Sequence, residues 1–567
     1  MPHRPCTRCL SKTINCVFGG VIADRKSYLE LNEIEACGRL LNASNFNSSF
    51  GINRHLVPCA AGPGVILAAL SIRSMNTPAP TRQDATQLRL LRDEQLHLSR
   101  FGSHFYGEAS TPNLVRIVLE IREDAEKQQL PLLYRRLKYW TFEPLKQRVS
   151  HTGPLVFPPP DLLMSLVDLY FRHSNIHCPI LHRPSFERAI AREQHLHDLS
   201  FGRNLLLVCG IGSRFSRDER ICRPGMNLLN VGREFFNQLL FQVDHLFATP
   251  TEMLHHIQFY ALAVTFLELS APMQCWTLVG IGLRIGQDIG VHRKHRSNTS
   301  YSELRKRAFW ALVCKDRQLG LAHGRPCMIR FEDLDAELPL ECDDEYWDTE
   351  VSSVTEAFIQ PAGKPSYISF FNLYIRLNCI LGVSMDLLYS IDKAKALLAY
   401  GDSLWEARIV SQLDSALSEW LQTIPHHLRW DPEHQPDKIL LKQSATLYCT
   451  YYHVQITIHR SLLQTEDRLK APSFTICTTA AQSCVRLLDS LESSADMPNI
   501  CPAIFASAMM LVLNLGNGSL DQESWVLDGV KRCMRTLKLF EERWQNAGLM
   551  WDLLYNLAIR EDLKSEL

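Results

Sequence analysis

The sequence lacks any strong bias in charge and any long hydrophobic run. Its 60 basic and 61 acidic residues leave a formal net charge of −1 over 567 residues. A surface that attracts nucleic acid must therefore be local, because no field of the whole chain draws a polyanion. The apolar run 503–515 is too short to cross a bilayer, and the polar N-terminus lacks the apolar segment of a secretory signal. We therefore expect no membrane partner.

Signatures of catalysis and of nucleotide binding are also missing. No G-x-x-x-x-G-K-[ST], H-E-x-x-H or G-x-S-x-G sequence occurs. We find no Ser/His/Asp or Cys/His combination that spacing alone supports, and we predict that the chain is not an enzyme. Its largest pocket should be mainly apolar, lined from residues 260–330, and without an acid–base pair. One helical apolar pattern carries Gly280, Gly282, Gly286 and Gly290 with no strand before it, which favours close helix packing over a dinucleotide site.

Alternating β-type patterns are scarce, whereas helical apolar spacing recurs along most of the chain. The fold class is therefore predicted as all-α, a large multi-helix body. Helices are expected near residues 87–98, 113–130, 162–171, 204–213, 231–246, 255–269, 276–289, 300–323, 367–398, 403–423, 439–462, 474–492, 502–515 and 527–545.

Local signals mark several helix ends. Asp161 is expected as the N-cap of the helix over 162–171. Ser300-x-x-Glu303 has the spacing of a capping box. Gly290 and the Gly324-Arg325-Pro326 segment are expected as helix stops, because glycine frees the backbone and proline cannot continue a helix. Residues 179–184 are expected as a turn between two prolines, and residues 346–366 as a loop.

Two kinds of charge cluster need an interpretation. The acidic run 341–345 lacks the spaced ligands of a calcium loop, so we expect a solvated loop. Two basic clusters are present, the loop 292–296 and the triplet Arg305-Lys306-Arg307. Each can be interpreted as a nuclear-import or nucleic-acid patch, or as an ordinary solvated surface. The solvated surface is favoured, because loops and helix starts often carry such charges.

Eighteen cysteines are present, and most lie singly in apolar segments, as Cys209, Cys275, Cys314 and Cys449 do. A reduced thiol there behaves as a small hydrophobic side chain, which fits a reducing intracellular compartment.

Only one set of cysteines is clustered, Cys6-x2-Cys9-x6-Cys16. The x2 spacing brings two thiolates to one Zn²⁺, and Cys16 is near enough to be a third ligand. Three thiolates do not complete a tetrahedron, and His3 is an alternative fourth ligand that we disfavour. The cluster is the candidate metal site.

The segment PCTRCLSKTINCVF resembles the second half of the six-cysteine cluster of fungal zinc-cluster transcription factors. The resemblance implies that Cys6 is a bridging Zn²⁺ ligand and that Cys9 and Cys16 are terminal ones. It also implies phosphate contacts from Arg8 and Lys12. Two Zn²⁺ ions need six thiolates and the chain offers three here, so we predict that it forms no binuclear cluster and that residues 1–20 are disordered.

Four ordered blocks over residues 162–398 resemble the fungal-specific transcription factor regulatory domain, also called the xylanolytic activator regulatory region. They are LVDLYFRHSNIHCPILHRPSF, LLLVCGIGSRFS, GLRIGQDIGVHRK and LRKRAFWALVCKDRQLGLAHGRPCMIRFEDLDAELPLECDDEYW. The resemblance implies a residual half-cluster over 1–20, a linker with short heptads over 21–60, and accessory helices over 61–157. A regulatory domain over 158–398 and a helical extension over 399–567 complete the expected organisation.

Family resemblance implies a nuclear regulator of RNA polymerase II genes that binds double-stranded DNA and zinc. It further implies a homodimer or heterodimer and contacts with transcription coregulators. We expect either that the chain is a truncated product, with the first half of the cluster missing, or that it has lost direct DNA binding. The alternative function is a regulator without a cluster that pairs with intact relatives or senses a small molecule.

Overall fold

The chain divides into two compact units in the computed structural model. One unit comprises residues 1–79 and 392–400, and the other comprises residues 80–391 and 401–567. The structure describes residues 16–18, 21–23, 106–126, 134–141, 154–223, 225, 227–239, 241, 249–268, 270, 272–294, 299–347, 358–389, 405–464, 467–491, 497–515 and 520–558.

The described part of the first unit is a small hairpin. Strands β1 (Cys16–Phe18) and β2 (Val21–Ala23) pair antiparallel, with Val17 opposite Ile22. These strands were not predicted from the sequence. Within the segment 1–20, which was predicted to be disordered, residues 16–18 form β1, and the other residues lie outside the described part of the chain. The expected helix over 87–98 also lies outside it.

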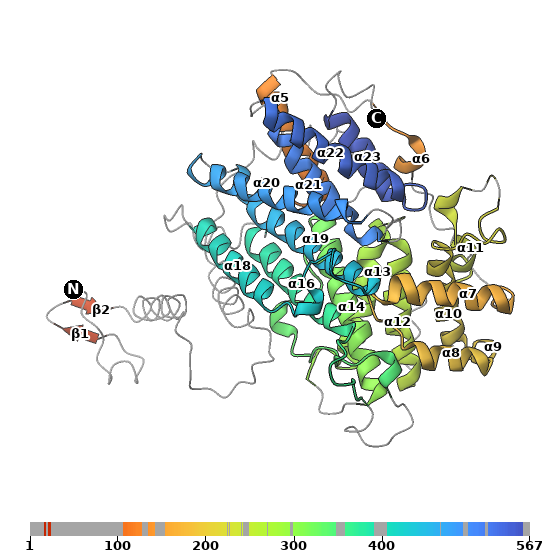
Figure 1. Cartoon of the computed structure of the whole chain (residues 1–567). Helices are drawn as coiled ribbons and strands as arrows, with labels where there is room; N and C mark the ends of the chain where they lie inside the picture. Colours follow the sequence, from red (N-terminus) through yellow and green to blue (C-terminus); the bar gives the residue numbers. More distant parts are fainter. Residues whose placement is uncertain are drawn as a thin grey trace. The chain divides into compact units, whose positions relative to one another are not determined.

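The described part of the second unit is helical, which confirms the predicted fold class (Figure 1). The longer helices are α5 (Thr111–Glu126), α7 (Pro160–Tyr170), α8 (Arg183–Ala191), α10 (Leu199–Ser213), α12 (Pro250–Leu267), α13 (Pro272–Asp288), α14 (Ser300–His323), α16 (Ile368–Leu388), α18 (Trp405–Gln422), α19 (Lys438–Arg460), α20 (Asp467–Asp489), α21 (Cys501–Asn514), α22 (Leu520–Phe540) and α23 (Gln545–Ala558). Short turns of helix are α6 (Leu137–Trp140), α9 (Gln194–His197), α11 (Arg233–Phe236), a π-helix η3 (Phe171–Asn175), and the 3₁₀ turns η4 (Leu228–Asn230), η5 (Phe331–Asp333), η6 (Asp344–Tyr346), η7 (His426–Leu428), η8 (Ser461–Gln464) and η9 (Pro498–Ile500).

Successive long helices pack side by side through most of this unit. Helix α10 contacts α7 and α12, and α12 contacts both α13 and α14. Helix α14 then contacts α16, which packs against α18 and α19. The C-terminal helices α19 to α23 continue the series pairwise, and α5 returns to contact α21 and α14 (Figure 1). Helix α14 therefore lies among elements from both ends of the unit.

A continuous hydrophobic core joins α5 to the C-terminal helices. Val115 and Val118 of α5 are fully buried in the same cluster as Ile504, Met509 and Leu537 from α21 and α22. Burying a side chain of this size stabilises the fold by about 1.5–3 kcal/mol. The core explains why α5, distant in sequence, packs on the last third of the chain.

Helix α16 is the one described helix long and apolar enough to cross a membrane by length and composition. Its 18-residue apolar window is 89% buried inside the protein, against α14, α18 and α19. A helix that is apolar on all sides and buried on all sides is a core helix.

Two predicted helix caps are wrong by one or two residues. The N-cap of α7 is Pro159, and Asp161 lies in the first turn. The capping box of α14 is formed by Thr299 and Ser302, not by Ser300 and Glu303. The predicted stops are confirmed, because Gly290 and Gly324 both adopt positive φ directly after their helices. Two long helices were missed, α8, which begins at the predicted turn, and α23.

The segment before α5 is fixed to the end of α14 by a close backbone contact. The Gly107 amide donates to the His323 carbonyl at 3.0 Å. A Cβ on Gly107 would lie 2.0 Å from the Gly324 oxygen, so no larger residue fits between the two backbone segments. Glycine is therefore required at this crossing for its lack of a side chain.

The glycines of α13 permit close packing, as the sequence predicted. A Cβ on Gly286 would lie 2.6 Å from a ring carbon of Phe309 in α14. A Cβ on Gly280 would instead meet the terminal methyl group of Met328 at 2.9 Å. Phe309 is fully buried and cannot move away, whereas a methionine end is flexible.

We expect Gly286→Ala to destabilise the protein by about 1–3 kcal/mol, because the new methyl group overpacks a fixed ring. Gly280→Ala is the matched control in the same helix. It should be neutral or stabilising by up to about 1 kcal/mol, because alanine has the higher helix propensity. Thermal unfolding of both variants measures the difference. Equal midpoints for the two variants would contradict the packing explanation.

Candidate functional site: a buried charge network around helix α14

The acidic run and the basic triplet of the sequence meet inside the protein. Arg307 of α14 is completely buried, and its Nη1 donates to Asp344 Oδ1 at 2.7 Å. Its Nη2 donates to the Cys342 carbonyl at 3.1 Å. The guanidinium carbon also lies 4.2 Å from the centre of the Trp347 ring, a cation–π contact. The predictions that these two clusters are solvated are therefore wrong for Lys306, Arg307, Cys342 and Asp343, all of which are buried.

A second buried carboxylate fixes the same helix. Glu303 has no exposed surface, and its Oε1 accepts a hydrogen bond from the Leu340 amide at 2.8 Å. Its Oε2 lies 2.7 Å from Lys306 Nζ. Glu303 therefore holds the segment before the acidic run and does not cap the helix.

The acidic run also reaches two further helices. Asp344 Oδ2 accepts from the Arg183 amide at 2.9 Å, at the start of α8. Asp343 Oδ1 accepts from Ser366 Oγ and the Tyr367 amide, each at 2.8 Å, at the start of α16. A carboxylate that accepts several N–H bonds at helix starts is favoured by the helix dipole. Residues 340–347 thus connect α8, α14 and α16 through charged and polar contacts, and we call this segment the acidic strap.

His182, the N-cap of α8, faces the acidic strap. Its ring stacks on Trp347 with centroids 4.7 Å apart, and its Nε2 lies 3.0 Å from the Asp344 carbonyl. A carbonyl can only accept, so Nε2 carries the proton, and Nδ1 accepts from the Ser185 amide. Burial lowers the pKa of His182 below its ordinary value of 6.5, and the neutral ring fits this bonding pattern.

Further along α14, a buried ion pair fixes the segment that follows Gly324-Arg325-Pro326 to the helix. Arg317 Nη1 lies 2.6 Å from Asp316 Oδ2, and Arg317 Nη2 donates to the Ile329 carbonyl at 2.7 Å. Asp316 also accepts from the Met328 amide at 2.9 Å. Burial raises the pKa of Asp316, and the neighbouring guanidinium opposes that rise. Removing one member of such a pair leaves an uncompensated buried charge.

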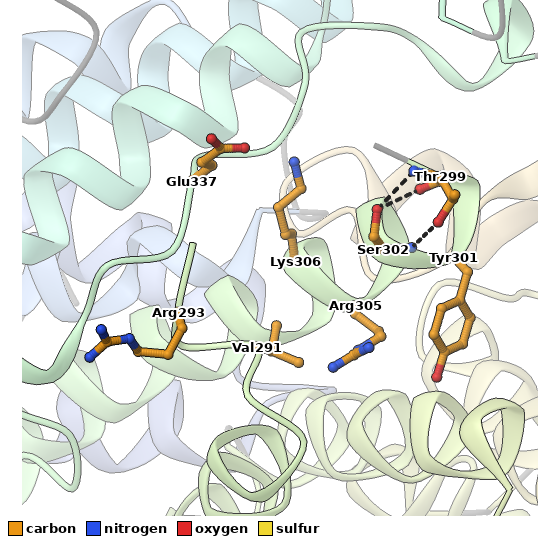
Figure 2. Close-up of a pocket in the computed structure, with 8 residues that line it drawn as sticks. All are labelled: Val291, Arg293, Thr299, Tyr301, Ser302, Arg305, Lys306 and Glu337. Carbon is orange, nitrogen blue, oxygen red and sulfur yellow. Dashed lines mark hydrogen bonds between the residues drawn. The ribbon is translucent and has the colours of Figure 1, made fainter. Parts of the chain in front are cut away.

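A polar pocket of about 250 Å³ opens beside the start of α14 (Figure 2). Thr299 and Ser302 form the capping box at its wall, and Glu337 lies opposite Lys306 in the view of Figure 2. The half-buried Arg305 donates to the Ile289 carbonyl at 2.7 Å and so caps α13. Arg293 and Lys294 of the basic loop are exposed, as predicted, and residues 295–296 lie outside the described residues. The complete lining is Val291, Arg293, Thr299, Tyr301, Ser302, Arg305, Lys306 and Glu337.

The pocket beside α14 therefore differs from the mainly apolar pocket expected from residues 260–330. Lys306 and Arg305 are already bonded to protein groups, so their main role here is architectural. A roomier pocket, of about 360 Å³, lies elsewhere, between Gln482 and Arg532 of the C-terminal helices.

The structure also brings together a serine, a histidine and an aspartate that sequence spacing could not connect. His459 Nε2 lies 3.0 Å from Asp414 Oδ1, and His459 Nδ1 lies 3.3 Å from Ser473 Oγ. Ser473 and His459 are 3% and 2% exposed, so a substrate has no access to the hydroxyl. Their contacts join α18, α19 and α20 and serve packing.

The candidate metal and DNA residues are not tested by these contacts. Cys6, Arg8, Cys9 and Lys12 lie outside the described residues, and only the backbone of Cys16 is described. In the described part of the chain, no group of three or more His, Cys, Asp or Glu side chains could hold a metal ion. The cysteines of the apolar segments are free and buried, as predicted: Cys209, Cys275, Cys314 and Cys449. Burial is the main cause of the raised thiol pKa in the first three. The pKa of Cys449 is also raised, mainly by a hydrogen bond with Cys484.

Comparison with known proteins identifies the helical body. Residues 167–422 match the fungal specific transcription factor domain. "Activator of stress genes 1" of Saccharomyces cerevisiae is 25% identical over 54% of this chain and 32% of its own length. "Cutinase transcription factor 1 alpha" of Fusarium vanettenii is 23% identical over 82% of this chain and 50% of its length. "Transcriptional activator protein acu-15" of Neurospora crassa is 25% identical over 59% of this chain and 35% of its length.

The fold defines an all-α body built around buried charges. Residues 167–422 of this body carry the fungal specific transcription factor domain, and the curated relatives named above are called activators or transcription factors. The chain spans between about a third and a half of the length of these curated relatives. No solved structure matches it.

We expect Arg307→Met to cost about 3–5 kcal/mol of stability, because it leaves the Asp344 carboxylate without its buried cation. Thermal and urea unfolding would show a lower midpoint. Lys364→Met is the matched control, since Lys364 is exposed and lies 3.6 Å from the exposed Glu345 of the same strap. It should give no measurable shift. A similar shift in both variants would contradict a buried network.

Acid should destabilise the native state through His182. A histidine whose folded pKa is lowered binds fewer protons folded than unfolded, so stability is lost as pH falls through the unfolded value of about 6.5. The unfolding midpoint should therefore decrease between pH values of about 7.5 and 5.5. His182→Asn should reduce this decrease, and His434→Asn, at an exposed histidine, should leave it unchanged. An identical pH profile for wild type and His182→Asn would exclude His182 as a contributor.

Proposed function

We propose that this chain is a nuclear, DNA-binding regulator of RNA polymerase II transcription. The observation that carries the proposal is the match of residues 167–422 to the fungal specific transcription factor domain. The curated relatives named above are called activators or transcription factors, which supports the same function. In this proposal the helical body transmits a regulatory signal, and coregulators and a second subunit of the same class are its protein partners.

The charge network supports a body that moves as one piece. The acidic strap joins the starts of α8 and α16 to the middle of α14, and each buried contact is costly to break. A displacement of α14 must therefore carry α8 and α16 with it, or break the strap. Rigid elements of this kind can transmit a displacement from a binding surface to a distant contact.

The zinc and DNA roles rest on the N-terminal cysteines. Cys6, Cys9 and Cys16 are proposed as Zn²⁺ ligands, with Arg8 and Lys12 as phosphate contacts. The three thiolates are half of those that a binuclear cluster needs, so DNA binding requires three more from elsewhere. If they are not supplied, the chain acts as an interaction partner or ligand sensor without its own DNA contacts.

A reporter assay tests the regulatory function independently of the cluster. The full chain is fused to an unrelated DNA-binding domain, and output is measured from a promoter that carries the matching site. A change in output relative to the DNA-binding domain alone is expected, and Arg307→Met should reduce that change because it breaks the strap. An unchanged output with stably expressed fusion protein would contradict a regulatory body.

DNA binding of the purified chain tests the finer proposal. We expect affinity for duplex DNA in the presence of Zn²⁺ to fall steeply as salt increases, because bound phosphates release counterions. Replacing both Arg8 and Lys12 by Ala should make the slope of log K against log[salt] shallower by about 0.9 for each lost contact. Fluorescence anisotropy measures both quantities. Absence of binding at every salt concentration would favour the regulator that lacks direct DNA contacts.

A further inference from the structure

A small cavity lies where the family domain contacts the C-terminal extension. Its volume is about 40 Å³, and the exposed Asn499 is one of its lining residues. One wall comes from α10, α12 and α14, and the other comes from η9 and the turn between α22 and α23. The lining residues are His173, Ser174, Cys178, Ile211, Arg214, Phe215, Thr265, Phe266, Glu268, Lys315, Pro498, Asn499 and Trp544.

Arg214 is a buried cation in this cavity with no carboxylate bonded to it. The residue is 4% exposed, and none of the ion pairs among the described residues includes it. Its Nη1 donates to the Arg543 carbonyl at 2.7 Å, its Nη2 donates weakly to Ser270 Oγ at 3.3 Å, and its buried Nε has no hydrogen-bond partner. Its guanidinium carbon lies 4.8 Å from the centre of the Phe266 ring.

The charges around the cavity do not balance. Lys315 Nζ is bonded to both oxygens of Glu268, at 2.7 and 2.6 Å, so that pair is neutral, and its carboxylate forms no ion pair with Arg214. Arg543 is a second cation beside Arg214 and donates to its carbonyl at 2.8 Å. Burial, with repulsion from Arg233 and Arg543, lowers the pKa of Arg214 to about 9. A surplus of positive charge therefore faces a space that a small molecule can enter.

Uncharged partners of Arg214 compensate only part of its buried positive charge. Arg214 ends α10, where the helix dipole favours a cation, and it bonds to one carbonyl. Water can enter a cavity of this size and satisfy Nε, since one molecule needs about 10–15 Å³. Neither the dipole nor water supplies a full negative charge, and an uncompensated buried charge is costly.

We propose that the Arg214 cavity binds a small carboxylate, either a free acid or the acidic end of a larger metabolite. A planar carboxylate can accept two parallel N–H bonds from one edge of a guanidinium. The cavity volume suits one such group, and the aromatic rings of His173, Phe215 and Trp544 form an apolar wall beside it. His173 and Phe215 stack with centroids 4.8 Å apart, and Phe215 packs on Trp544 at 5.8 Å.

Because the cavity lies at the junction of the matched domain and the C-terminal helices, ligand binding there would have a regulatory consequence beyond the proposed function. The bound carboxylate would contact α10 of the matched domain and the turn that carries Trp544, outside it. Ligand binding would therefore strengthen the junction between residues 167–422 and the C-terminal helices. The site is independent of the N-terminal cysteines, so failure of zinc or DNA binding would leave it intact.

Acetate and inorganic phosphate are the probes for the full purified chain. Calorimetric titration and thermal unfolding are recorded at constant ionic strength, set with sodium chloride, which carries no carboxylate. We expect acetate to raise the unfolding midpoint by about 2 °C or more and to show saturable binding. Phosphate should give a smaller shift. Saturation by phosphate and not by acetate would overturn the assignment to a carboxylate.

Two variants connect the effect to the site. Arg214→Met should abolish the acetate-dependent shift, whereas Arg220→Met, at an exposed arginine paired with Asp161 and Asp218, should retain it in full. Because Arg214→Met could unfold the protein, Thr265→Met provides a second test by filling the cavity from α12 without removing the cation. It should reduce acetate affinity at least tenfold. Wild-type protein with no acetate response, or an undiminished response in folded Arg214→Met or Thr265→Met, would overturn the proposal.

Discussion

The ion pair between Arg307 and Asp344 is the interaction on which the rest of the helical body depends. It joins the centre of α14 to a segment that has no regular structure of its own apart from one 3₁₀ turn. That segment bonds in turn to the starts of α8 and α16. Burying both charges is unfavourable by itself, and hydrogen bonds to Cys342, Arg183 and the cation–π contact with Trp347 offset the cost. The pair therefore fixes an arrangement more than it adds stability.

The helical architecture could be predicted from the sequence because apolar spacing is a local signal. Most predicted helices overlap an observed one, and the stops at Gly290 and Gly324 are confirmed by positive φ. Helix α23 was missed although Leu553, Leu554 and Leu557 are buried on it, because the sequence offered no clear break after α22. The predicted N-caps differ from the observed ones by one or two residues. Several adjacent hydroxyl and acidic residues can each occupy the N-cap position, and packing decides which of them does.

The candidate site could not be predicted, because charge patterning does not report burial. Arg307 and Asp344 lie 37 positions apart, and each sits in a cluster that resembles an ordinary solvated surface. Arg214 could not be predicted either, because its lack of a carboxylate partner among the described residues depends on how distant helices meet. Sequence did identify the region that contains the network, because its blocks resemble a known family. It could not distinguish a charged surface from a charged core.

The contact between Gly107 and Gly324 has a consequence for how the start of the described helical body is held in place. The described helical body begins at Tyr106, and within one residue its backbone is bonded to the last turn of α14. A displacement of the backbone at Gly107 therefore acts directly on the helix that carries Arg307. Since neither position tolerates a Cβ, the two glycines can be replaced only together with a shift of the whole crossing. The start of the described helical body is thus fixed to a helix that lies far along the sequence from it.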